Sequence, residues 1–211
     1  MPALTQAAAF DALIADVRAC HQCARMAHAH VLGPANGRLT ARVLFVAEAV
    51  GRRGGAITGV PLTRDESGKR FAAFLAAAGI PRDDAFITNA VLCNPLDAAG
   101  RNRPPTAREA ARCRPFLART LALVRAPVVV ALGRVALESL RAVAPHDADL
   151  PRDAGRAVAW REPRVIVPMY HPSRQSTLHR PHEQQLADWR RLGDIVRAHA
   201  PARGLGYHAA G

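Results

Sequence analysis

Four cysteines offer the clearest chemistry in the sequence. Cys20 and Cys23 form a Cys-x-x-Cys pair in the segment CHQC, whereas Cys93 and Cys113 are separated by 19 residues, and the chain has no other cysteine. Thiolates bind zinc or iron–sulphur clusters, and the long second spacing suits a cluster better than a zinc ribbon with two close pairs. The spacing therefore predicts a metal centre with all four as ligands. A cluster, a zinc ion and four unrelated buried thiols remain as alternatives.

Alternating strands and helices must position these residues. Apolar, β-branched runs predict buried strands at 42–49, 84–92, 126–133 and 164–170. Helical patterns fall around Phe10 to Val17, over 69–80, from a Thr106–Glu109 capping box to about Val124, and over 134–143 and 182–199. This alternation predicts an α/β fold with a central, mostly parallel four-stranded sheet flanked by helices.

Parallel sheets bind ligands at the carboxyl ends of their strands. We therefore expect the functional site in the loops that follow Ala49, Val91 and Tyr170. No internal repeat or composition break divides the chain. The sequence predicts a single domain over residues 1–200 and a loose C-terminal tail over 201–211.

The chain is strongly basic. It contains 29 Lys and Arg residues against 17 Asp and Glu residues, a formal net charge of +12 over 211 residues. Such a balance favours an anionic partner, of which nucleic acid is the usual one. Only one of the basic residues is lysine, Lys69. The preference for arginine is also typical of a GC-rich genome.

The first twenty residues lack a basic start, an apolar block and a cleavage site. No apolar run reaches the roughly 20 residues that span a bilayer. We expect a cytoplasmic, nucleoid-associated protein of bacterial type without a membrane partner. Cysteines in that compartment are rarely joined as disulfides.

The cysteine pattern and its surroundings resemble one known family. An early Cys-x-x-Cys, a third cysteine in ITNAVLCNP and a fourth in TAREAARC are similar to the iron–sulphur uracil-DNA glycosylases, whose superfamily includes families 4 and 5. The resemblance runs from about Cys20 to Trp189. It implies the uracil-DNA glycosylase fold and a [4Fe–4S] cluster bound by Cys20, Cys23, Cys93 and Cys113.

The glycine-rich loop after the first strand resembles both families. Glu48-Ala49-x-Gly51 is similar to the Gly-Glu-Ala-Pro-Gly of family 4, and the Gly-Gly-x-x-Thr-Gly at 54–59 is similar to family 5. Glu48 is the only carboxylate in the first half of this loop and directly follows an apolar strand, so we expect it to position or polarise the attacking water, with Gly51 at the substrate. Asp65 is the reserve candidate for that role.

Other motif residues are expected to contact the base. By the resemblance, Asn89 reads the uracil edge, which suits an amide that donates and accepts at once, and His171 of the His-Pro-Ser motif donates to O2 of the departing base. Leu62 stands where many members place an aromatic ring against the flipped uracil, and Val50 stands where proline is usual.

Eight residues are expected to contact the DNA. Ser173 is expected to bond a phosphate, and Arg174 and Gln175 to probe the duplex and fill the space left by the flipped nucleotide. Between the third and fourth cysteines, Arg101 and Arg103 are expected to face phosphates, together with Arg108, Arg112 and the adjoining Arg114. This loop contains no histidine that could bond covalently to the DNA sugar, as one branch of the superfamily does.

The sequence thus predicts a monomeric, monofunctional DNA glycosylase that hydrolyses the N-glycosidic bond of uracil, or of another deaminated base, and starts base excision repair. Two alternatives remain. One is a glycosylase-like protein that binds damaged DNA with weak turnover or altered specificity. The other is a zinc-stabilised nucleotide-binding protein, although the glycine-rich loop lacks the Lys-Ser/Thr of a P-loop.

Overall fold

A five-stranded sheet forms the middle layer of the protein. The computed structural model describes residues 5–199. The sheet has the strand order β3-β2-β5-β7-β6, in which β2, β3, β5 and β7 are parallel and β6 is antiparallel to β7. Its strands are β2 (Val43–Ala49), β3 (Ala85–Val91), β5 (Val128–Leu132), β6 (Val158–Ala159) and β7 (Val165–Met169).

The predicted α/β class is confirmed, and the predicted count of four strands is wrong. The missing strand, β6, has two residues and pairs Ala159 with Val165 at the sheet edge. A strand this short carries no alternating pattern that periodicity could detect. The four predicted strands are all present, each within two residues of its predicted bounds.

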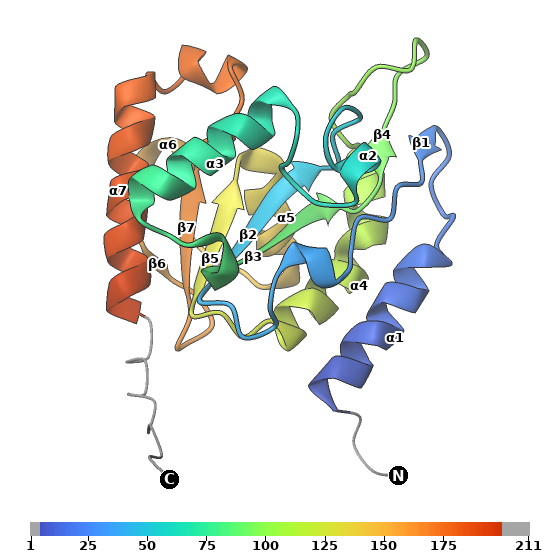
Figure 1. Ribbon diagram of the computed structural model, residues 1–211, viewed down its shortest axis with the longest axis horizontal. Coiled ribbons are helices and arrows are strands. Elements are labelled where there is room, and N and C mark those ends of the chain that lie inside the picture. The colour runs from blue at the N-terminus through green and yellow to red at the C-terminus, as the bar shows by residue number, and fades with distance from the viewer. Residues whose placement is uncertain (1–4, 200–211) are drawn as a thin grey trace, which may run out of the picture.

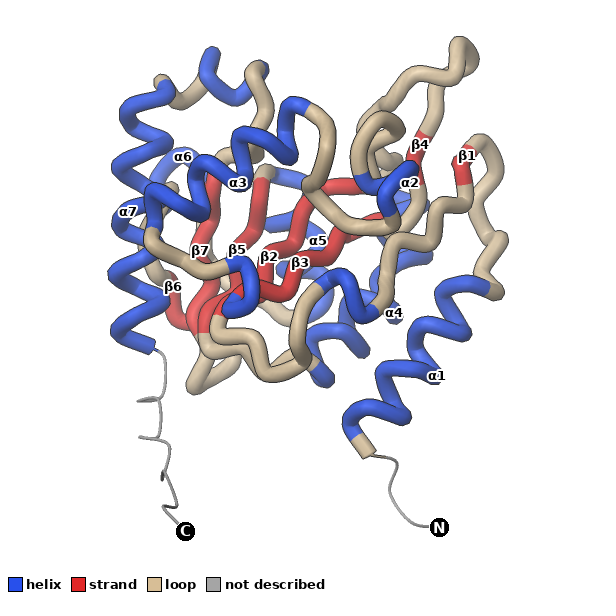
Figure 2. Tube along the Cα trace, in the orientation of Figure 1, coloured by secondary structure: helices blue, strands red, loops and turns tan. Residues whose placement is uncertain are grey.

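Helices cover both faces of the sheet. In Figure 1, α3 crosses in front of the strands and α7 runs along the left side of the sheet, whereas α4 and α5 lie behind the strands. The main helices are α1 (Gln6–Arg18), α3 (Glu66–Ala78), α4 (Ala107–Leu123), α5 (Arg134–Val143) and α7 (His182–His199). Figure 2 shows the strands as a single layer between these helices.

Short elements occupy the connections. They are β1 (Met26–Ala27), η1 (Pro34–Asn36), α2 (Gly55–Thr58), η2 (Arg82–Asp84), β4 (Asn94–Pro95), α6 (Leu150–Asp153) and η3 (Gln175–Leu178). β1 and β4 pair antiparallel in a separate small sheet, which lies beyond the carboxyl ends of the large sheet's strands (Figure 1). The predicted tail at 201–211 falls outside the described residues.

Strand alternation divides the core into two layers. On β2, Leu44 and Val46 pack with α1, α4 and α5, whereas Val43, Phe45 and Ala47 pack with α3 and α7. The period of two residues sends successive side chains to opposite faces, and both faces are buried. This explains why the parallel strands read as continuous apolar runs.

Two helix starts determine how the loops enter the site. Thr106 and Glu109 form the predicted capping box at the start of α4. Asp65 caps α3 by accepting a hydrogen bond from the Gly68 amide at 2.9 Å. α3 therefore begins at Glu66, three residues before the predicted start at Lys69, because the cap and not the apolar pattern sets its first turn.

None of the helices between residues 5 and 199 is long and apolar enough to cross a membrane.

Candidate active site

A cleft of about 810 Å³ opens at the carboxyl ends of the parallel strands. Its lining combines residues from the loops after β2, β3, β5 and β7, which the parallel arrangement brings to one edge of the sheet. Nine residues that were given a role from the sequence line it, namely Glu48, Gly51, Leu62, Asp65, Asn89, Arg103, His171, Ser173 and Gln175, and Val50 lines it too. Arg101 and Arg174 do not.

Asn89 contributes an unsatisfied amide to the cleft. It lies near the end of β3, opposite Ala47 of β2, and only 3% of it is exposed. Its side-chain nitrogen Nδ2 is buried without a hydrogen-bond partner. Buried polar atoms without partners are rare in folded proteins. An unpaired donor at a cleft wall is therefore a strong indication of a ligand that accepts a hydrogen bond there.

Glu48 brings a carboxylate to the same cleft. It is the penultimate residue of β2 and is half-buried. Burial raises the pKa of the Glu48 carboxyl above its ordinary value. No hydrogen bond or ion pair to this carboxylate is found within residues 5–199, so its oxygens are available to a bound water or ligand.

His171 is held in its neutral form. Burial lowers the pKa of the imidazole to about 4, while the charge of Asp65 acts weakly in the opposite direction. A neutral imidazole has one N–H donor and one acceptor nitrogen. At neutral pH, His171 can thus donate a single hydrogen bond without introducing a positive charge.

The glycine-rich loop closes tightly over Asp65. A Cβ atom on Gly54 would lie 2.6 Å from the Thr63 carbonyl oxygen, and one on Gly51 would lie 2.9 Å from Oδ2 of Asp65. At Gly54 the clash is with backbone, so only glycine allows this approach, whereas at Gly51 only the Asp65 carboxylate would have to shift. Because Oδ1 of Asp65 caps α3, this carboxylate contributes to loop structure whether or not it also acts in catalysis.

Leu62 lines the cleft in an unusual backbone conformation. Its φ angle of 50° lies in the left-handed region, which residues other than glycine seldom adopt. Its side chain is half-buried and packs against the core beneath α3. Leu62 therefore presents an aliphatic surface to the cleft where the resemblance leads one to expect an aromatic ring.

Two asparagines that the sequence did not single out as site residues connect the loop after β3 to the glycine-rich loop after β2. Asn94 Nδ2 donates to the Val50 carbonyl at 2.6 Å and to Oδ1 of Asn102 at 3.0 Å. The same Asn102 oxygen accepts from the Arg52 amide at 3.2 Å. Oδ1 of Asn94 is buried without a partner. In a sequence, an asparagine after a strand is equally typical of a turn residue and of a site residue. Only the folded structure therefore reveals this connection.

Two of the arginines predicted to contact DNA already form ion pairs within the protein. Arg101 is exposed and pairs with Asp97 at 2.8 Å. Arg103 donates through both terminal nitrogens to the Glu109 carboxylate, at 2.8 and 2.7 Å. Arg103 therefore has little hydrogen-bonding capacity left for a phosphate.

Ser173 and its neighbours form the rim of the cleft. The Ser173 hydroxyl lies 2.9 Å from that of Ser176 and accepts from the Ser176 amide at the start of η3. Arg174 and Gln175 are exposed beside it. Leu178, at the end of η3, lines the cleft and is 81% exposed. The sequence analysis missed Leu178, although a lone leucine in the polar segment HPSRQSTLHR was a usable signal.

The four cysteines are free thiols, of which Cys20 is half-buried and the other three are buried. Burial, reinforced by the other cysteines, raises the thiol pKa of Cys93 and raises that of Cys113 to about 11. The backbone amides of His30 and Leu92 donate to these two sulphurs. Arg112 donates to the Gln22 carbonyl and lies 4.0 Å from the Cys23 sulphur.

No compact cluster geometry is seen among these thiols. Four sulphurs about 2.3 Å from one tetrahedral zinc ion would lie roughly 3.8 Å from each other. Within residues 5–199, the only group of metal-ligating side chains that close together consists of three histidines. The prediction that the cysteines form a four-thiolate cluster site is therefore not confirmed by their arrangement here, although the same spacing also argues against a single zinc ion.

The fold and the cleft define an α/β protein with hydrogen-bonding side chains gathered at the carboxyl edge of a parallel sheet. The chain belongs to the uracil-DNA glycosylase superfamily, whose members hydrolyse N-glycosyl bonds, because residues 34–192 match that family. The matched segment contains the cleft residues Glu48, Asn89 and His171.

Individual relatives agree with this assignment. The chain is 28% identical over 197 residues to the type-4 uracil-DNA glycosylase of Archaeoglobus fulgidus, covering 90% of this chain and 95% of the relative. It is 32% identical over 137 residues to the type-4 enzyme of Thermotoga maritima, covering 65% and 67%. It is 32% identical over 161 residues to the type-5 enzyme of Thermus thermophilus, covering 68% and 70%. The resemblance stated from the sequence motifs is thus confirmed.

Proposed function

We propose that the protein is a monofunctional DNA glycosylase that removes uracil, or a closely similar deaminated base, from DNA. The observation that carries the proposal is the buried, unpaired amide nitrogen of Asn89. A uracil ring presents carbonyl oxygens along its pairing edge, and these accept the hydrogen bond that Asn89 lacks. Relatives named as type-4 and type-5 uracil-DNA glycosylases support the same substrate.

The base must leave the double helix before it can enter such a cleft. Enzymes that act on a base rotate it out of the stack into a pocket, and unstacking requires a few kcal/mol. Leu178 is a large apolar side chain on the cleft rim, 81% exposed. Apolar side chains of this kind enter the base stack in other DNA-binding proteins. We assign Leu178 to the vacated space, next to Arg174 and Gln175.

His171 and Glu48 supply the chemistry at the two sides of the N-glycosidic bond. As the bond breaks, negative charge develops on the departing base and the sugar gains oxocarbenium character. The neutral imidazole of His171 donates to the base oxygen where charge develops, which is an oxyanion-stabilising role. The carboxylate of Glu48 accepts a proton from the attacking water and stabilises the positive sugar. Asp65 remains the reserve for this second role.

The four cysteines fit a [4Fe–4S] cluster in kind and surroundings. All four are free, no zinc-like packing is present, and backbone amides donate to two of the sulphurs, as is typical around cluster thiolates. A bound cluster would connect the end of α1, the end of β3 and the second turn of α4. Cys20, Cys23, Cys93 and Cys113 are its proposed ligands.

The function is tested by excision from a labelled duplex containing one uracil, followed by alkaline cleavage of abasic sites. We expect cleavage of the uracil strand and none of a matched thymine strand. Asn89→Ala should abolish cleavage, whereas Asp83→Asn, on the exposed surface in η2, should retain it. Specific binding of the uracil duplex without cleavage would instead indicate a damage-binding protein.

The cluster is tested separately by visible absorption and iron analysis of anaerobically purified protein. We expect a brown protein with about four iron atoms per chain. Cys113→Ser should lose iron and unfold at a lower temperature. A colourless wild-type protein that excises uracil at full rate would refute the cluster and leave the glycosylase assignment intact.

A further inference from the structure

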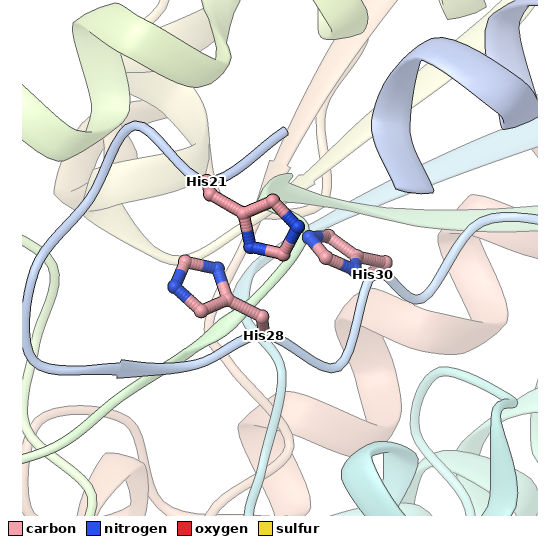
Figure 3. A group of neighbouring side chains, drawn as sticks. All are labelled: His21, His28 and His30. Carbon is pink, nitrogen blue, oxygen red and sulfur yellow. The ribbon is translucent and has the colours of Figure 1, made fainter. Parts of the chain in front are cut away.

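Three histidines near the N-terminus surround a common point. His21 lies inside the Cys-x-x-Cys turn, and His28 and His30 follow β1 (Figure 3). Their ring centroids are 4.9 Å apart for His21 and His28, and 5.5 Å apart for each of the other two pairs. One ring nitrogen from each lies within 4.8 Å of the other two. Figure 3 shows the three rings facing one another.

Two of the three rings also contact the cysteine segments. His30 Nε2 lies 2.8 Å from the Cys20 carbonyl oxygen. A carbonyl can only accept, so Nε2 carries the proton and Nδ1 keeps a free lone pair. Nδ1 of His28 lies 3.9 Å from the Cys93 sulphur. Metal-bound histidines characteristically make such contacts through their second nitrogen.

The backbone is shaped to bring the rings together. His30 has a φ of 45°, in the left-handed region that side-chain-bearing residues seldom adopt. His21 is exposed to solvent and His28 is at least partly exposed. Packing in the protein interior therefore does not explain why these rings lie together.

The distances suit a metal ion after a small rearrangement. Zinc binds histidine nitrogen at about 2.0–2.1 Å, so two nitrogens of a tetrahedral site are about 3.4 Å apart. The present separations, within 4.8 Å, close to that value through modest side-chain rotations. Three imidazoles are a preferred donor set for zinc and for other divalent transition metals.

We propose that His21, His28 and His30 form a binding site for a divalent transition-metal ion, with zinc as the expected occupant and solvent as the fourth ligand. The site uses imidazole ligands only, although it borders the cysteines, since His21 lies between Cys20 and Cys23 and His28 contacts the Cys93 sulphur. Its ligands belong to the segment that carries Cys20 and Cys23 and continues through β1. Since β1 pairs with β4, whose Asn94 and Pro95 line the cleft, a bound ion would fasten this segment against the cleft wall.

The test uses full-length protein purified without a histidine tag, because a tag would itself bind zinc. Zinc and iron are measured together in the wild type after zinc titration and removal of free metal. We expect one zinc per chain with the iron content unchanged. His21→Ala and His28→Ala should weaken zinc binding by at least about 10-fold, the loss seen even for outer-shell partners. His182→Ala, an exposed histidine at the start of α7, should bind zinc normally.

Cobalt(II) identifies the donor atoms. Imidazole-bound cobalt gives weak visible bands, whereas thiolate-bound cobalt adds intense charge-transfer absorption in the near ultraviolet. We expect only the weak bands in wild-type protein, and their loss in His21→Ala. The proposal would be overturned if zinc still bound after both histidine substitutions, or if zinc bound only as iron was lost. It would also be overturned if the wild-type protein bound no zinc at micromolar concentrations. The same variants are assayed for uracil excision, so failure of the metal site is distinguishable from failure of the glycosylase assignment.

Discussion

The ion pair between Arg103 and Glu109 should contribute strongly to folding, and Glu109→Gln tests this directly. Both side chains are largely buried, with exposed fractions of 22% and 10%. Hydrogen bonds from Arg103, and secondarily from Thr106, lower the pKa of Glu109 from 4.5 to about 2. At 1.36 kcal/mol per pKa unit, this shift corresponds to on the order of 3 kcal/mol of stability at neutral pH.

The contribution has a defined pH dependence. The pKa of Glu109 is lower in the folded protein than in the unfolded chain, so its stabilising effect is fully present above about pH 5. It declines as the pH falls from the unfolded value toward about 2. At pH 3, less than about half of it should remain.

Urea unfolding of wild type and Glu109→Gln, followed by circular dichroism at pH 7 and pH 3, measures both effects. We expect a loss of on the order of 3 kcal/mol at pH 7, or roughly 6–12 °C in melting temperature for a chain of this size, and a much smaller difference at pH 3. Asp83→Asn is the matched control, because it removes the exposed Arg38–Asp83 pair, whose side chains are 72% and 77% exposed. Its effect should be close to zero. Equal unfolding of Glu109→Gln and wild type at pH 7, or an undiminished difference at pH 3, would refute the reasoning.

Three further predictions concern catalysis. His171→Ala should slow uracil excision on the order of 100- to 1000-fold while abasic DNA still binds; equal losses in both would assign His171 to DNA positioning. Burial raises the pKa of Glu48, and catalysis needs its ionised carboxylate, so the wild-type rate should fall as the pH drops through a pKa above the ordinary glutamate value. Glu48→Gln should be slow and should not show this acidic decline in rate. A wild-type rate that stays constant down to pH 4 would contradict the role of Glu48. The loop 94–112 contains no histidine, so the product should be free abasic DNA, and a protein–DNA band that survives denaturation would show a covalent intermediate instead.

The strands and long helices could be read from the sequence because their signals are local. The parallel strands are buried on both faces, so each appears as an apolar run, and α7 matches its predicted bounds of 182–199. β6 was missed because two edge residues carry no pattern. β1 and β4 were missed because they also have only two residues each. In addition, their pairing depends on contact between distant segments, which a local pattern does not reveal.

The candidate site was predictable where a residue type alone implies chemistry at a strand end. Glu48, Asn89 and His171 each follow or end an apolar strand, and the parallel sheet places all three at one cleft. The hydrogen bonds that already occupy a side chain were not predictable. Arg103 was expected to face phosphate, yet Glu109, six residues away, binds both of its terminal nitrogens. Sequence spacing does not reveal whether such a pair forms across a loop.

Hydrogen bonds and an ion pair along one wall of the cleft would let a group bound by the cysteines influence a reaction in the cleft without contacting the substrate. One wall of the cleft is the segment from Asn94 to Pro104, which has little regular structure of its own. Asn94 ties its start to Val50 of the glycine-rich loop, and Arg103 ties its end to Glu109 in the first turn of α4. Cys93 immediately precedes the segment, and Cys113 lies one turn beyond Glu109. Any group that joins those two thiols therefore fixes both ends of this wall, and with them the position of the loop that follows Glu48.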